Sequence, residues 1–132
     1  MSYTDVMRDA YARYGNRDFD LVDDVFAEDI DWKIEGIVAV SGREAVREFF
    51  NGLAADLAAH TITIDDSVED GDRLICFVTH SVTRHDGESG QFKAVHDWRF
   101  RDGQAASLHE IADTLSFAVF TGQVPAPATA TA

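Results

Sequence analysis

Residues 91–113 decide the fold of this chain, and they read QFKAVHDWRFRDGQAASLHEIAD. The first half alternates between two kinds of side chain, and one side of it carries Phe92, Ala94, His96, Trp98 and Phe100. A period of two with aromatic residues on one side is typical of a half-buried strand. Arg101-Asp102-Gly103-Gln104 then predicts a tight turn, because Gly103 can supply the positive φ that a hairpin needs. A second strand over about residues 105–112 completes the predicted hairpin.

The residues before this hairpin predict three helices. Residues 4–15 carry apolar side chains at three- and four-residue spacing. A short helix is expected over about residues 19–27, with Asp18 as its cap. The third helix begins in SGREAVREFF, where Ser41 precedes Glu44 at the spacing of a capping box.

Three further segments predict strands, over residues 31–35, 61–68 and 74–83. The last of these is apolar on both sides and therefore needs cover on both sides, so we expect a second subunit and a homodimer. Helices toward one end and strands toward the other predict the α+β class, as a cone-shaped, strongly curved, mostly antiparallel sheet with three N-terminal helices on its concave face. Such a fold leaves a conical cavity, where small ligands bind.

Composition limits the classes of partner. The 132 residues suit one domain, which we expect over residues 1–122, followed by a disordered tail, QVPAPATATA, at residues 123–132. A net charge of −13 argues against nucleic acid and anionic membranes as partners. No apolar run approaches the roughly 20 residues that span a bilayer, and the start is too polar for a signal peptide. The sequence therefore predicts a cytoplasmic protein.

One residue interrupts the apolar side of the first hairpin strand. His96 lies between Ala94 and Trp98 and is predicted to point into the cavity. A histidine there can donate or accept a proton near neutral pH. The structural alternative is a core histidine that bonds a backbone carbonyl or a tyrosine.

Glu110 is the second candidate, and its direction depends on the length of the turn. A two-residue turn at Asp102-Gly103 pairs His96 with His109. A three-residue turn with a glycine bulge puts Glu110 on the side of His96. The apolar pattern favours this second turn, which also directs inward the residues Ala106, Leu108 and Ala112. Burial would raise the pKa of the carboxyl and a charged histidine would lower it, and such coupling suits a general acid/base.

Further residues are expected to line the pocket or its mouth, and none is expected to bind a metal or a cofactor. Aromatic side chains that could line the pocket are Tyr14, Trp32, Phe77 and Trp98, and carboxylates at strand ends near its mouth are Glu35 and Asp113. His80, His85 and His109 share no metal-ligand spacing, so we expect no metal. No glycine-rich phosphate loop or nucleophile motif is present in the sequence, and we expect no cofactor.

Four segments carry a resemblance to a known family: FAEDIDWKIEG, SGREAVREFF, HDWRFRDGQ and HEIADT. With the pattern of residues 4–120, they resemble the nuclear transport factor 2-like superfamily, and more closely its SnoaL-like (polyketide cyclase-like) and ketosteroid isomerase-like members. The resemblance implies a cone-shaped α+β barrel that serves both enzymes and binding proteins.

The resemblance also implies roles for particular residues. The catalytic base of the steroid isomerases matches Ile34, and their second oxyanion-hole acid matches His96. Their oxyanion-hole tyrosine falls near Ala10, with Tyr11 adjacent. Two of these three roles are missing, which argues against steroid isomerisation by that mechanism. Polyketide cyclases of the family carry a histidine at His96 and a carboxylic acid, typically aspartate, at Glu110.

These observations predict a small cofactor-free enzyme. Glu110, helped by His96, would move a proton next to the carbonyl group of an apolar substrate, in an isomerisation or an intramolecular aldol closure. Stabilising the enolate needs a hydrogen-bond donor, and His96 is the expected one. A non-catalytic binding or accessory protein with the same pocket, and a dimerising scaffold with a filled core, remain alternatives.

Overall fold

Six strands form one strongly curved sheet in a computed structural model that describes residues 2–125. In chain order they are β1 (Phe26–Ile34), β2 (Val38–Ser41), β3 (Ala59–Asp70), β4 (Arg73–Thr83), β5 (Ser89–Arg101) and β6 (Gln104–Ala112). Their order across the sheet is β2-β1-β6-β5-β4-β3, and only β1 and β6 pair in parallel. The sheet does not close, because β2 and β3 remain as edges. The predicted α+β class with a curved, mostly antiparallel sheet is confirmed.

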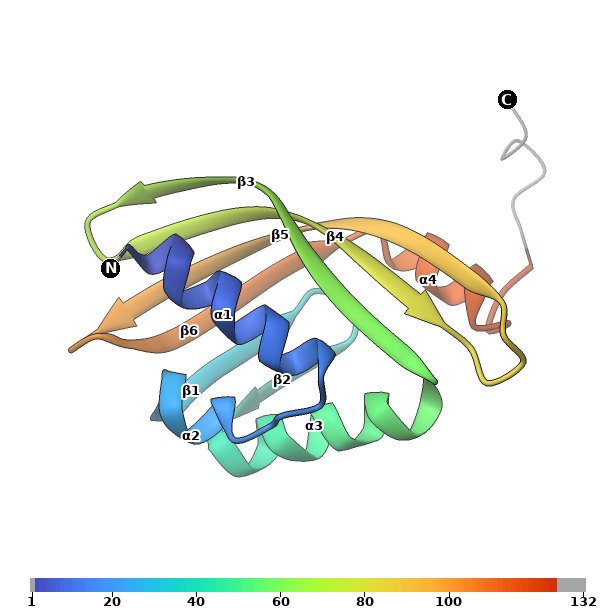
Figure 1. Ribbon diagram of the computed structural model, residues 1–132, viewed down its shortest axis with the longest axis horizontal. Coiled ribbons are helices and arrows are strands. Elements are labelled where there is room, and N and C mark those ends of the chain that lie inside the picture. Colours follow the sequence, from blue (N-terminus) through green and yellow to red (C-terminus); the bar gives the residue numbers. More distant parts are fainter. Residues whose placement is uncertain (1, 126–132) are drawn as a thin grey trace.

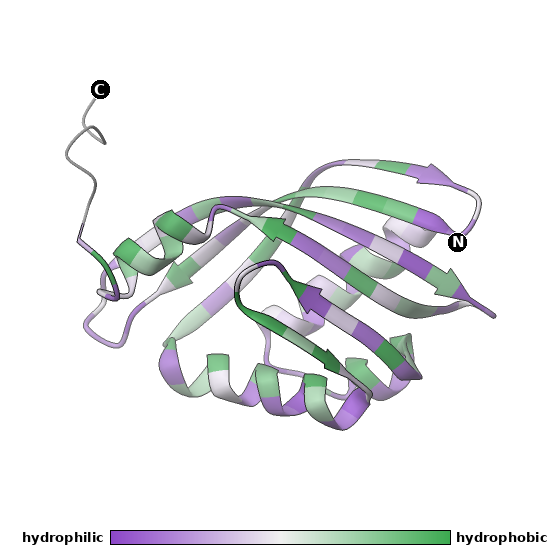
Figure 2. Ribbon diagram, turned by 180° about the vertical axis from the view of Figure 1, so that it is seen from behind, coloured by the Kyte–Doolittle hydropathy of each residue, from purple (hydrophilic) through white to green (hydrophobic). Residues whose placement is uncertain are grey.

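Helices cover the concave side of this sheet (Figure 1). They are α1 (Tyr3–Gly15), α2 (Leu21–Val25), α3 (Arg43–Asp56) and α4 (Thr114–Phe120). Helix α1 crosses the hollow under the long strands, and α3 lies along the β1 side. Hydrophobic and hydrophilic residues alternate along the strands, as a sheet with one buried face requires (Figure 2). No helix among the described residues is long and apolar enough to cross a membrane.

The boundary between α2 and β1 differs from the prediction. The expected helix over residues 19–27 is shortened to Leu21–Val25, and β1 begins at Phe26 rather than at residue 31. Phe26 pairs with Ala105 of β6 and is 1 % exposed, while the Arg43 side chain donates to its carbonyl oxygen. Pairing with a distant strand therefore outweighs the local helical pattern.

Both expected helix caps are wrong. The Ser41 hydroxyl donates to Asp31 Oδ1 at 2.7 Å across the β1–β2 pair, and α3 starts after Gly42, whose φ is +92°. Asp18 accepts a hydrogen bond from Arg13 Nε, and α2 starts after Asp20 without a side-chain cap. In each case the polar side chain bonds another element of the tertiary structure.

Two elements were missed, β2 and α4. Helix α4 packs on β5, where the Phe120 ring lies over Gly90 so closely that a Cβ there would sit 2.8 Å from Phe120 Cδ1. The predicted count of three helices is thus correct for the N-terminal part and short by one at the C-terminus. Residues 123–125 of the expected tail have no helix or strand, and residues 126–132 lie outside the described residues.

The β5–β6 hairpin combines features of both expected turns. Asp102 and Gly103 have φ of +53° and +80°, as in a two-residue hairpin turn, so the favoured three-residue turn is wrong. The register shifts once, between Arg99 and Phe100, which pair with Ser107 and Ala105. The extra residue, Ala106, is a bulge. Ala105 rather than Ala106 is therefore buried, and the bulge sets the direction of every later side chain of β6.

Candidate functional site

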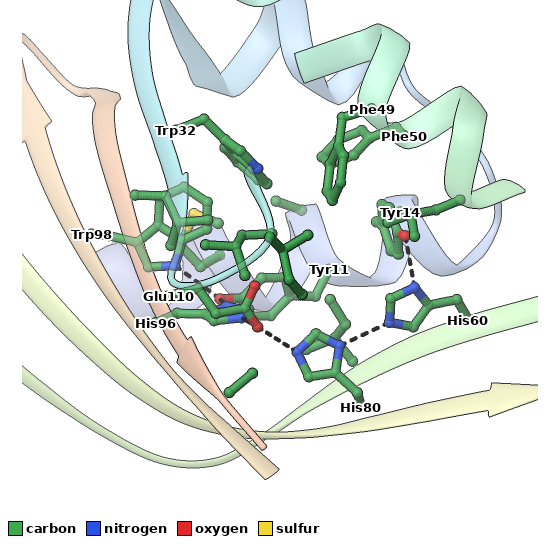
Figure 3. A pocket seen from close by; sticks show the side chains of 18 of the residues that line it. Tyr11, Tyr14, Trp32, Phe49, Phe50, His60, His80, His96, Trp98 and Glu110 are labelled. Atoms are coloured by element: carbon green, nitrogen blue, oxygen red, sulfur yellow. Dashed lines mark hydrogen bonds and ion pairs between the residues drawn. The ribbon is translucent and has the colours of Figure 1, made fainter. Parts of the chain in front are cut away.

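A pocket opens between the concave face of the sheet and α1, α3 and α4 (Figure 3). The pocket has a volume of about 110 Å³, against the roughly 10–15 Å³ that one water molecule needs. Its lining is almost wholly apolar and includes Phe26, Phe49, Phe50, Phe92 and Phe117. This volume is below the roughly 300–1,000 Å³ of pockets for drug-sized ligands and close to the roughly 150 Å³ of a cavity that binds benzene, so the pocket suits a ligand of few rings.

Glu110 sits in this lining between two histidines. Its Oε2 lies 2.7 Å from His96 Nε2 and 2.7 Å from His80 Nε2, and all three residues are buried. His96 is the register partner of Glu110 on β5, while His80 comes from β4. One carboxylate oxygen is therefore held by two rings from two neighbouring strands.

Further hydrogen bonds extend this arrangement to both sides. Beyond His80, His60 Nε2 lies 2.8 Å from His80 Nδ1, and the Tyr14 hydroxyl lies 2.8 Å from His60 Nδ1. Beyond His96, its Nδ1 lies 2.6 Å from the Tyr11 hydroxyl, which accepts from Trp98 Nε1 at 2.8 Å. We call the resulting chain the pocket network; it consists of Tyr14, His60, His80, Glu110, His96, Tyr11 and Trp98.

One set of proton positions satisfies the whole pocket network. An ionised Glu110 can only accept, so His80 and His96 both present Nε2–H to it. His80 Nδ1 is then an acceptor for His60 Nε2–H, and His60 Nδ1 accepts from the Tyr14 hydroxyl. His96 Nδ1 accepts from the Tyr11 hydroxyl in the same way. Every donor in the network points toward the carboxylate, so the hydrogen bonds together stabilise the negative charge of Glu110.

The ionisation of these groups follows from their surroundings. Burial alone would raise the pKa of Glu110, but His96 and the hydrogen bond from His80 outweigh it and hold that pKa well below its usual value. Burial, with the neighbouring His80, lowers the pKa of His60 to about 3. Burial also lowers the pKa of His80. Near neutral pH the site therefore holds an ionised carboxylate beside neutral His60 and His80.

Three of these side chains could also hold a metal ion. His80, His96 and Glu110 offer one ligand atom each, and these atoms lie within 4.8 Å of one another. The outer nitrogens of both histidines are hydrogen-bonded, as metal-ligating histidines usually are. The separations of 2.7 Å between Oε2 and each nitrogen are hydrogen-bond distances, so an ion would have to replace both bonds. The sequence shows no metal-ligand spacing for this cluster, because its members lie on three different strands.

The structure brings most of the expected pocket residues together. Tyr14, Trp32, Ile34 and Trp98 line the pocket with His96 and Glu110. Ile34 is paired with Glu110 across the parallel β1–β6 contact.

Two expected pocket residues lie elsewhere. Phe77 is 43 % exposed on the opposite side of β4 from Cys76 and Val78, because side chains alternate along a strand. Asp113 is exposed and caps α4, where its Oδ1 accepts from the Ser116 backbone N–H. Neither residue is in the pocket lining.

The site residues predicted from the sequence did not include His80, His60 or Tyr11. His80 lies at the end of an apolar run. It is on the same side of β4 as Val78 and Val82, and Phe77 is on the other side, so this alternation could have predicted that His80 points inward. His60 faces the pocket from β3, and Tyr11 shares the inward side of α1 with Met7 and Tyr14. For these two, no local signal separates a site residue from a core residue.

Comparison with solved structures defines the class of this fold. An NTF2-like protein of unknown function from Burkholderia pseudomallei K96243 is 27% identical, with a TM-score of 0.81, over 89% of this chain and 96% of that one. TerC, crystallised with polyporic acid, is 25% identical with a TM-score of 0.81, over 90% and 97%. IdmH from Streptomyces antibioticus, described as a candidate polyketide cyclase, shares the fold at 18% identity and a TM-score of 0.81, over 94% and 100%. The fold is that of the NTF2-like superfamily.

The family is narrower than the fold. The model of the SnoaL-like domain matches residues 7–108, which is most of the chain. The chain therefore belongs to the SnoaL-like domain family. No curated protein matches it at a significant level.

Proposed function

We propose that this protein binds a small, mostly apolar carbonyl compound and moves a proton next to the carbonyl group without a cofactor. Glu110 is the base, and the reaction is an isomerisation or an intramolecular ring closure. The observation that carries the proposal is a buried carboxylate that two histidines hold by one oxygen, with its other oxygen free, in an otherwise apolar pocket.

That free oxygen is Glu110 Oε1. Both hydrogen bonds to the carboxylate end on Oε2, and Oε1 has no partner among the described residues. Trp32 Nε1 is the only side-chain nitrogen or oxygen of residues 2–125 that is buried without a partner, so Oε1 retains accessible surface. Because Glu110 lines the pocket, a ligand there can meet Oε1 directly.

The role of His96 in this proposal differs from the expected one. Both of its ring nitrogens are already bonded, to Tyr11 and to Glu110. His96 is therefore a positioning residue that orients Glu110 and holds it ionised, and it is not free to donate to a substrate oxygen.

The electrostatics also limit the substrate. A carboxylate whose pKa is held low is a weak base, and proton transfer is efficient only when the two pKa values are not far apart. We therefore expect a substrate whose transferred hydrogen is acidified by its surroundings, such as one on a carbon beside a conjugated carbonyl group.

A non-catalytic binding protein is the alternative, and the same pocket supports it. TerC, a relative of similar fold, was crystallised with polyporic acid, which favours a small organic ligand for this pocket in either case. The two functions differ only in whether Glu110 exchanges a proton with the ligand.

Hydrogen exchange on a model ketone tests the proposal. β-Tetralone is a bicyclic, apolar ketone whose hydrogens next to the carbonyl exchange in D₂O, and NMR follows their loss. We expect the wild type to accelerate this exchange and Glu110→Gln to reduce the acceleration by about 100-fold or more, with binding little changed. His109→Gln is the matched control, because His109 lies on the other side of β6 and bonds the exposed Glu35. Binding without any acceleration in the wild type would favour the alternative.

We also propose a homodimer formed through the outer face of the sheet. Phe77, Val95 and Ile111 pair in one row across β4, β5 and β6, and Phe77 and Ile111 are 43 % and 57 % exposed. Val68 on β3, 54 % exposed, extends the patch. A contiguous apolar patch on a sheet is a common site of association, and a second copy is the partner that offers the same surface.

A further inference from the structure

The pocket leaves a donor unpaired as well as an acceptor. The hydroxyl, imidazole and indole groups of the pocket network bond one another, so its N–H and O–H donors are used, and Glu110 Oε1 is its unpaired carboxylate oxygen. Thr114, the remaining hydroxyl of the lining, is half-buried at the start of α4, within reach of water. Trp32 Nε1 is different, because it is buried and has no partner among the described residues.

The position of Trp32 makes this unpaired N–H unusual. The residue is 6 % exposed, and its ring packs against Phe26, Phe50 and Trp98. Its indole nitrogen lies on the side of the ring that faces the centre of the pocket, toward Phe49 (Figure 3). The other indole of the pocket, Trp98, donates to Tyr11. Buried N–H groups are almost always hydrogen-bonded, so an unpaired one that faces a cavity indicates a missing acceptor.

Trp32 and Glu110 lie close together on the sheet. Trp32 pairs with Leu108, and Ile34 pairs with Glu110, so the two residues are on neighbouring parallel strands and two positions apart. Side chains at such positions point to the same face. Both side chains therefore belong to the lining of the same pocket.

We propose that Trp32 Nε1–H is the hydrogen-bond donor to the ligand and that, together with Glu110 Oε1, it selects ring-bearing apolar ligands that carry a carbonyl oxygen beside an acidic hydrogen. This inference rests on the proposed function and deepens it. The carbonyl oxygen accepts from Trp32, and the hydrogen faces Glu110. When Glu110 Oε1 takes the proton, the electron pair of the broken C–H bond moves to the carbonyl oxygen, and the Trp32 N–H stabilises the resulting enolate.

The two tryptophans of this chain provide a direct test. In ¹H–¹⁵N NMR spectra the indole N–H groups give two signals, which Trp32→Phe assigns. We expect β-tetralone to move the Trp32 signal downfield and to leave the Trp98 signal in place. Tetralin, which has the same carbon skeleton without oxygen, should leave both near their positions.

Affinity gives a second readout on folded variants. Loss of one hydrogen bond corresponds to a change in Kd of roughly threefold to tenfold. We expect Trp32→Phe to weaken binding of β-tetralone by about that factor and to change binding of tetralin by less than about twofold. Trp98→Phe is the matched control, because its N–H is already bonded within the protein, and it should not discriminate between the two compounds.

The outcomes separate this inference from the proposed function. Equal effects of Trp32→Phe on both compounds, an unmoved Trp32 signal, or saturable binding of neither compound would overturn the donor role. If exchange still depends on Glu110 in that case, the proposed function stands and only the inference fails. If the Trp32 signal responds to the ketone but no exchange occurs, the ligand class stands and the catalytic proposal fails.

Discussion

Glu110 lies directly across the β5–β6 ladder from His96, and its Oε2 is 2.7 Å from His96 Nε2. This pairing depends on the bulge at Ala106. A regular two-residue hairpin would place His109 opposite His96 and turn Glu110 to the outer face. The extra residue restores the inward direction of Leu108 and Glu110, so a local irregularity of the backbone creates the buried carboxylate.

Removing His80 should raise the pKa of Glu110. His80→Phe keeps a ring of similar size against Phe92, with which His80 is stacked at 4.4 Å, but removes one of the two donors to Oε2. With one donor fewer to offset the effect of burial, the ionised carboxylate is less stable. We therefore expect the pKa of Glu110 to rise by about one pH unit or more. NMR of a ¹³C-labelled Glu110 carboxyl measures this, and His85→Phe, at an exposed site, is the control. An unchanged titration would mean that His80 does not hold the carboxylate ionised.

Acid should destabilise the fold through His60. Its pKa is about 3 in the folded protein against an ordinary value of 6.5, so between these values the unfolded chain binds a proton that the folded chain does not. The free energy of unfolding therefore falls as the pH drops through this window, by up to about 1.4 kcal/mol per pH unit from this group. Urea unfolding at several pH values should show a shallower dependence in His60→Phe. A wild-type stability that is flat from pH 6.5 to pH 4 would contradict a neutral His60 in the folded protein.

The homodimer can be tested by one charge on its expected interface. Phe77→Asp places a carboxylate at the β4 end of the Phe77, Val95 and Ile111 row, where a dimer would have to bury it without a partner. We expect sedimentation to show a dimer for the wild type and a monomer for the variant. Leu115→Asp is the control, because Leu115 is 52 % exposed on α4, away from this row. A wild-type monomer at micromolar concentration would reject the proposed interface.

The cluster of His80, His96 and Glu110 should work without a metal. Its hydrogen bonds satisfy Glu110 Oε2 and both rings at once, and an ion would have to displace two bonds of 2.7 Å. We expect dialysis against EDTA to leave the thermal midpoint and the exchange activity unchanged, and added Zn²⁺ to give no large increase in midpoint. A loss of activity on chelation that Zn²⁺ or Fe²⁺ reverses would show that these three residues are metal ligands.

The sequence predicted the class of the fold because the period of its apolar residues is a local property. The alternation in β5 and the helical spacing in α1 can be read without knowing what packs against them. The same alternation placed His96 inward. It did not find β2, α4 or the true start of β1, because these depend on partners far along the chain, such as Ala105 for Phe26 and Gly90 for Phe120.

What the sequence determined by itself is therefore an α+β sheet of alternating strands with a histidine on its inner face. Only the tertiary structure decided that Glu110 faces the same way, that His80 and His60 join it, and that Trp32 retains a free N–H. The physical reason is that hydrogen bonds between side chains require positions fixed to within a few tenths of an ångström. Those positions are set by the bulge and by the register of five strands, and they are not encoded in the spacing of any one segment.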